Sequence, residues 1–161
     1  MNTKPQREIT LPSDTQIQIQ RDFHFAKQLV YRAFADSANH DKWVGCGMGT
    51  CTLSTGKPEI GEPWHFKMEI PEMGEMHLFG QCLEAVQDEK LVRTFIYNVP
   101  GIRECPSVET ATFTEQNGVT TLKIVIQHFS KENRDGHLQS GMEEGVTASY
   151  DRLEEYLGEI E

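Results

Sequence analysis

Hydrophobic and polar residues alternate near the start of the chain, where Ile17, Ile19 and then Phe23 stand against Gln16, Gln18 and Gln20. This period of two predicts a half-buried strand over residues 15–23. Over residues 26–35 the period becomes helical, because apolar side chains recur one turn apart on a single face: Leu29, Val30, Ala33 and Phe34. We therefore expect a short helix directly after the first strand.

Capping residues and turn residues mark the next elements. Asp36 and Ser37 can accept hydrogen bonds from free backbone N–H groups, which predicts a second short helix ending near Trp43. Over residues 50–129, runs of strand-forming residues alternate with turn residues, which predicts an antiparallel meander of about six strands. The turns are expected at residues 56–58, 71–74, 88–89, 100–101 and 117–118.

For two segments of this meander, the sequence predicts the local structure in more detail. Trp64, Phe66 and Met68 alternate with polar residues, so they should share the buried face of one strand. Asn117 and Gly118 both tolerate a positive φ. A type I′ hairpin turn is therefore expected at these two residues.

The helical period returns after Ser130, where apolar residues form one stripe with Tyr150 beside it: Leu138, Met142, Val146, Leu153 and Leu157. We expect one long C-terminal helix. Gly141 and Gly145 fall inside it and cost roughly 1 kcal/mol each relative to alanine in a helix interior. Close packing of the helix on the sheet would explain them, and so would room for a ligand or a local bend.

This order of elements predicts an α+β fold in which a curved antiparallel sheet of six to seven strands wraps around the long C-terminal helix, with two short helices after the first strand. One helix cannot fill a broad curved sheet, so we expect a partly empty, aromatic-lined space between them, the usual setting of a small-molecule pocket. The chain should form a single domain over residues 15–161, after a flexible N-terminal segment over residues 1–14.

Length, charge and hydrophobicity limit the number of domains, the kinds of partner and the location that we expect. The 161 residues suit one compact domain. The 15 Lys and Arg against 25 Asp and Glu give a formal net charge of −10, so we expect no nucleic-acid partner. No apolar run reaches the ~20 residues that cross a bilayer. The polar first 14 residues do not resemble a secretory signal, so we expect a cytoplasmic protein.

The cysteines and histidines show no pattern typical of a metal site. Four residues separate Cys46 from Cys51, which is wider than the usual zinc spacing, and no matching pair of ligands accompanies them. Cys82 and Cys105 bring the number of cysteines to four. That is few for a disulfide-stabilised protein, and a chain of this length can build a core without disulfide bonds. We expect reduced thiols, no metal and no cofactor.

Three segments of the sequence resemble a known superfamily: RDFHFAKQLVYRAFADSANHDKW, GEMHLFGQCLEAVQDEKLVRTF and SGMEEGVTASYDRLEEYL. They are similar to the SRPBCC (START/Bet v-like) superfamily, and within it to the AHSA-like group, which resembles the C-terminal domain of the Aha-type activator of a heat-shock-protein ATPase. The resemblance covers residues 17–157. It implies a helix-grip fold with a deep cavity between the sheet and the C-terminal helix.

The residues expected to bind a ligand are the large or flexible side chains on strands and on the helix stripe that could face this cavity. They are Trp43, Trp64, Phe66, Met68, His77, Phe79, Phe95, Tyr97, Met142, Val146 and Tyr150. Each has a plain alternative as part of the core. The directions of Phe79, Phe95 and Tyr97 depend on where β-bulges fall.

Acid–base chemistry has fewer candidates. His77 and His128 could point inward, and Glu69, Arg93 and Glu109 could join them. No arrangement of nucleophile, base and orienting group is evident in the sequence, so we predict no catalytic residue.

Three functions follow as hypotheses. The first is the binding of a small hydrophobic or amphipathic molecule, such as a lipid, in the cavity. The second is an enzyme of the polyketide cyclase or hydratase type that uses the same cavity through His77, His128 or a tyrosine. The third is a domain that interacts with a chaperone ATPase. The sequence leaves the ligand and the oligomeric state open.

Overall fold

A computed structural model of the chain describes residues 7–45, 49–98 and 106–161. Its strands form one eight-stranded antiparallel sheet in the order β1-β2-β8-β7-β6-β5-β4-β3. The strands are β1 (Arg7–Thr10), β2 (Gln16–Phe23), β3 (Thr50–Thr55), β4 (Pro63–Ile70), β5 (Gly74–Val86), β6 (Lys90–Asn98), β7 (Ser107–Gln116) and β8 (Val119–His128).

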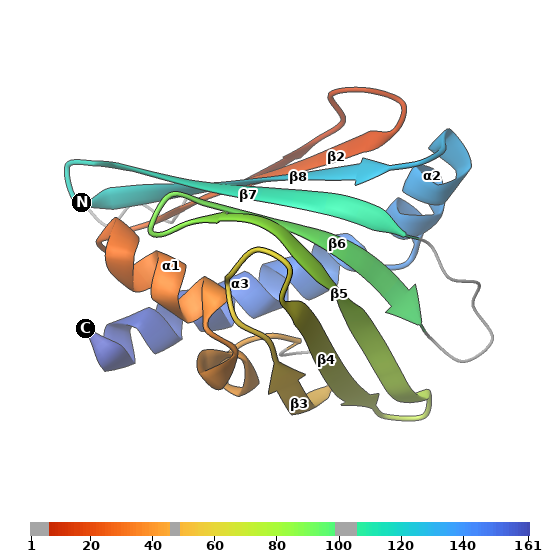
Figure 1. Cartoon of the computed structure of the whole chain (residues 1–161), viewed down its shortest axis with the longest axis horizontal. Coiled ribbons are helices and arrows are strands. Elements are labelled where there is room, and N and C mark those ends of the chain that lie inside the picture. Colours follow the sequence, from red (N-terminus) through yellow and green to blue (C-terminus); the bar gives the residue numbers. More distant parts are fainter. Residues whose placement is uncertain (1–6, 46–48, 99–105) are drawn as a thin grey trace.

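The helices lie against one side of this sheet. They are α1 (Lys27–Ala35), the 3₁₀ helix η1 (Ser37–Lys42), α2 (Lys131–Gln139) and α3 (Met142–Ile160). Figure 1 shows the sheet curving around α3, with α1 near one end of that helix and α2 at the other. This α+β helix-grip arrangement confirms the predicted fold class, with a sheet slightly larger than expected.

Local sequence signals explain several elements. The alternation in β2 buries Ile17 and Ile19, as the period of two predicted. The Asp36 carboxylate accepts a hydrogen bond from the Ala38 backbone N–H at 3.0 Å, which confirms the predicted cap of the second short helix. Asn117 and Gly118 have φ of 54° and 78° in the two-residue turn between β7 and β8, which confirms the predicted hairpin.

Two elements differ from the prediction. The short strand β1 pairs with β2, so residues 7–10 belong to the sheet. The expected single C-terminal helix is corrected to two helices, α2 and α3, because Gly141 lies between them with φ of 85°. A left-handed backbone at this point cannot continue an α-helix. No helix in the described ranges is both long and apolar enough to span a membrane.

The buried apolar residues form two separate clusters. The larger joins α1 and α3 to the inner faces of β2, β7 and β8. The smaller lies on β4 and β5 and consists of Trp64, Phe66, Met68, Met76 and Leu78. Since α3 packs mainly on the larger cluster, the inner face of β4 and β5 is left to line a space between the two.

Candidate functional site

A cavity of about 510 Å³ lies between the sheet and α3. This volume falls within the range of small-molecule pockets. Its walls come from both apolar clusters, and α2 contributes polar residues, among them Asn133, His137 and Gln139. The cavity is therefore mostly apolar, with polar groups at particular points.

Most of the residues predicted to bind a ligand line this cavity. The structure brings together Trp43, Trp64, Phe66, Met68, Phe95, Met142, Val146 and Tyr150. Trp43 also closes the region beside the short helices, because its indole N–H donates to the carbonyl oxygen of Ala33 at 3.0 Å. Tyr97 belongs to β6, but its side chain lies outside the described part of the chain.

His77 and Phe79 are not among the cavity residues. Met76 and Leu78 of β5 point inward, so the residues between and after them point to the opposite face of the sheet. There His77 shares a hydrogen bond of 2.8 Å with His65 of β4, and Phe79 packs edge-on against the same His65 ring. The expectation that these two side chains face the cavity is corrected accordingly.

Gly80 allows one aromatic wall of the cavity to form. Trp64 on β4 pairs with Gly80 on β5, and its indole N–H donates to the carbonyl oxygen of Thr94 on β6 at 3.0 Å. The indole must therefore cross β5 at Gly80, which has no side chain. Beyond it, the Trp64 ring contacts the Phe95 ring with centroids 4.7 Å apart.

Arg93 and Glu109 bring opposite charges to the same wall. They are direct partners in the β6–β7 register, and both line the cavity. The Arg93 guanidinium lies over the Trp64 and Phe34 rings, 4.9 and 5.7 Å from their centroids. Burial raises the pKa of the Glu109 carboxyl, and the Arg93 charge opposes that shift in part.

Tyr150 faces these charges from α3. Its ring packs against Phe23 and Trp43, with centroids 6.2 and 5.9 Å away. Burial, and then the Glu109 charge, raise the pKa of its hydroxyl, so Tyr150 stays protonated and can donate a hydrogen bond. This part of the cavity wall thus combines polar groups with the aromatic rings around them.

Three histidines also reach the cavity. His40 is buried, and its Nε2 lies 2.7 Å from the carbonyl oxygen of Phe34. A carbonyl can only accept, so Nε2 carries the hydrogen and Nδ1 accepts from the Ser54 hydroxyl at 2.8 Å. A 3.0 Å hydrogen bond joins His128 of β8 to His137 of α2. Burial lowers the pKa of His40 and of His137 to about 4.

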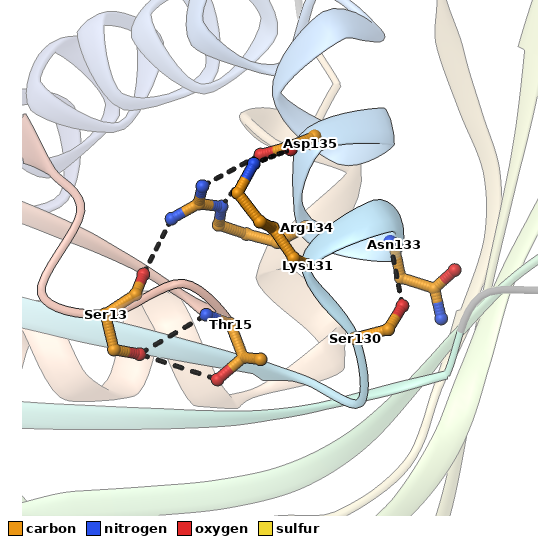
Figure 2. Close-up of polar contacts among 7 residues, drawn as sticks. All are labelled: Ser13, Thr15, Ser130, Lys131, Asn133, Arg134 and Asp135. Atoms are coloured by element: carbon orange, nitrogen blue, oxygen red, sulfur yellow. Dashed lines mark hydrogen bonds and ion pairs between the residues drawn. The ribbon is translucent and has the colours of Figure 1, made fainter.

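Polar contacts hold α2 in place, and Figure 2 shows those among seven residues of α2 and of the segment between β1 and β2. The Ser130 hydroxyl caps the helix by accepting a hydrogen bond from the Asn133 N–H at 3.0 Å. The buried Arg134 donates to the carbonyl oxygen of Ser13 at 2.6 Å and to the Asp135 carboxylate at 2.8 Å. The bond from Arg134 to Ser13 ties α2 to the segment between β1 and β2.

Several residues that line the cavity were not predicted from the sequence. His40, Met76 and Leu78 line the wall, and the alternation of β5 could have identified the last two. Of the acid–base candidates, His128, Arg93 and Glu109 face the cavity, whereas Glu69 is exposed on the outer face of β4.

The described residues offer no evident metal site. No group of three or more His, Cys, Asp or Glu side chains that could hold an ion occurs within residues 7–45, 49–98 and 106–161. Cys82 is a buried thiol, and burial raises its pKa. Cys46 and Cys105 lie outside the described residues.

Solved structures with this fold come from several bacteria. A protein from Rhodobacter sphaeroides is 20% identical, with 97% of this chain and 100% of that chain covered and a TM-score of 0.88. Protein Ms6760 from Mycobacterium smegmatis is 17% identical, with 98% and 100% covered and a TM-score of 0.85. The AHSA1 protein from Silicibacter pomeroyi is 19% identical, with 91% and 99% covered and a TM-score of 0.73. At these identities the likeness concerns the fold alone.

The sequence itself matches a family. No curated protein matches this sequence. A family model described as "Activator of Hsp90 ATPase homolog 1-like protein" matches residues 24–158, which confirms the resemblance to the AHSA-like group. Since this match spans well over half of the sequence, the chain belongs to the family of Activator of Hsp90 ATPase homolog 1-like proteins.

Proposed function

We propose that the protein binds a small amphipathic molecule in the cavity between the sheet and α3. The observation that carries this proposal is the cavity itself, at about 510 Å³ and with mostly apolar walls. Burying an apolar ligand against such walls is worth roughly 25 cal/mol per Å² of apolar surface removed from water.

The helix side of the cavity supports the same function. Gly145 of α3 is buried and lines the cavity, so the absence of a side chain there leaves space beside the sheet. Met142, one helical turn earlier, also lines the cavity and has a flexible side chain that adapts to irregular contents. This wall therefore combines open volume with an adjustable surface.

The first test truncates the wall. Phe66→Ala and Met142→Ala should each weaken the binding of 1-decanol by about tenfold, or roughly 1.4 kcal/mol, because each removes apolar contact area from the cavity. Titration calorimetry with 1-decanol measures the affinity, and circular dichroism checks that each variant folds.

The matched control is Phe79→Ala, which truncates an aromatic residue on the opposite face of the same part of the sheet. It should leave the affinity for 1-decanol unchanged. Unchanged binding in both cavity variants would count against this cavity as the binding site. Native mass spectrometry of gently purified protein would show in addition whether a small molecule copurifies.

A second candidate function is interaction with a chaperone ATPase, which the description of the matching family favours. In that case, adding the purified chain to an Hsp90-type ATPase should raise its rate of ATP hydrolysis several-fold. An equal amount of heat-denatured chain is the control. An unchanged hydrolysis rate at saturating concentrations of the chain would exclude this activity.

A further inference from the structure

Arg93 places a permanent positive charge inside the cavity. Although burial lowers its pKa, a guanidinium stays protonated in proteins. The Trp64 and Phe34 rings fix its position, since it lies over both of them. Within the described part of the chain, Arg93 has neither an ion pair nor a side-chain hydrogen bond. A cation held in this way retains donors for another group.

The carboxyl group opposite Arg93 in the sheet is a weak counter-ion for this charge. Glu109 stands opposite Arg93 in the β6–β7 register, yet no ion pair joins the two side chains. Burial favours the protonated form of Glu109, because it raises the pKa of the carboxyl. This shift weakens Glu109 as a counter-ion for the guanidinium.

Tyr150 adds a donor from the other side of the cavity. Its hydroxyl stays protonated, and it belongs to α3, which faces the sheet. Two hydrogen-bond donors, Arg93 and Tyr150, therefore face one cavity from β6 and α3, and the Glu109 carboxyl of β7 lies opposite Arg93 in the register. The surrounding wall is apolar, with Ile124 of β8 and Phe66 of β4 among its members.

We propose that this polar region is the head-group site for an amphipathic carboxylic acid, whose carboxylate pairs with the Arg93 guanidinium while its apolar body lies against the aromatic wall. The planar fork of a guanidinium matches a carboxylate in two parallel hydrogen bonds. The inference rests on the proposed function and specifies the class of ligand for the same cavity.

The test compares two probes of equal chain length, decanoate and 1-decanol, by titration calorimetry on the full chain. Decanoate should bind at least about tenfold more tightly, because only the acid forms a charge-assisted pair with Arg93. In Arg93→Met the apolar stem and its packing remain. This variant should lose that preference for decanoate while it keeps its affinity for 1-decanol.

The two proposals fail in different ways. Equal affinities for decanoate and 1-decanol in the unmodified protein would overturn the head-group site and leave the binding function standing. Absence of binding of either probe would count against the binding function and would overturn the head-group site with it.

A second variant keeps the test decisive if Arg93→Met does not fold. Glu109→Gln keeps the shape and a hydrogen-bond donor and removes any negative charge. It should bind decanoate at least as tightly as the unmodified protein. Weakening by about tenfold or more would show that a negative charge on Glu109 favours binding, and would overturn the assignment of a carboxylate.

Discussion

Gly80→Ala should destabilise the protein by about 3 kcal/mol, a large effect for adding one methyl group. A Cβ at position 80 would collide with the backbone carbonyl of Thr94, which accepts the hydrogen bond from the Trp64 indole. The strand backbone cannot move away without breaking β5–β6 pairing. The added methyl group would also occupy the path by which the indole crosses β5.

Urea unfolding followed by circular dichroism measures this loss. Gly136→Ala is the matched control, because nothing lies near the position of an added Cβ there and the residue is exposed within α2. That substitution should be neutral or stabilise by up to about 1 kcal/mol. A free energy of unfolding for Gly80→Ala close to that of the unmodified protein would show that β5 and β6 can separate without cost.

Mild acid should also lower the free energy of unfolding by a large amount. The pKa of His40 falls from 6.5 to about 4 on folding, so below pH 6.5 the unfolded chain binds a proton that the folded protein excludes. The stability associated with neutral His40 is therefore complete above pH 6.5, and it is lost as the pH falls toward 4. The loss amounts to about 3 kcal/mol. His137 acts in the same direction over the same range.

Urea unfolding at a series of pH values between 7.5 and 4.5 measures this dependence. In His40→Gln the free energy of unfolding should be lower at pH 7.5, and it should fall less steeply with acid, because one titrating group has been removed. His137→Gln should flatten the same curve. A slope that neither substitution changes would show that other groups cause the acid sensitivity.

The fold was largely predictable because its strands follow simple local rules. The alternation in β4 identified Trp64, Phe66 and Met68 as inward residues, and Asn117-Gly118 identified the hairpin. Gly141 was harder to interpret, since a glycine within a helical stripe can stay helical or turn left-handed. The four-residue strand β1 is too short to give a clear period.

The site was less predictable because it depends on the register between strands. Arg93 and Glu109 meet only because β6 pairs with β7 in one register, and β5 contains a register shift between Cys82 and Glu84. A sequence does not reveal such a shift, so the directions of residues on neighbouring strands remain open. His77 illustrates the same limit, since its direction follows from its buried neighbours Met76 and Leu78.

The strand order also determines how the chain must come together. Every neighbouring pair in the sheet joins consecutive strands except β2 and β8, in which Phe23 pairs with Thr120. The pairs within the β3–β8 meander therefore join strands that follow one another in the sequence, whereas the β2–β8 pairing brings together segments separated by most of the chain. Forming the β2–β8 pairing therefore has the largest loop-closure entropy cost in the sheet. The β1–β2 hairpin thus depends on the completed meander for its place in the fold.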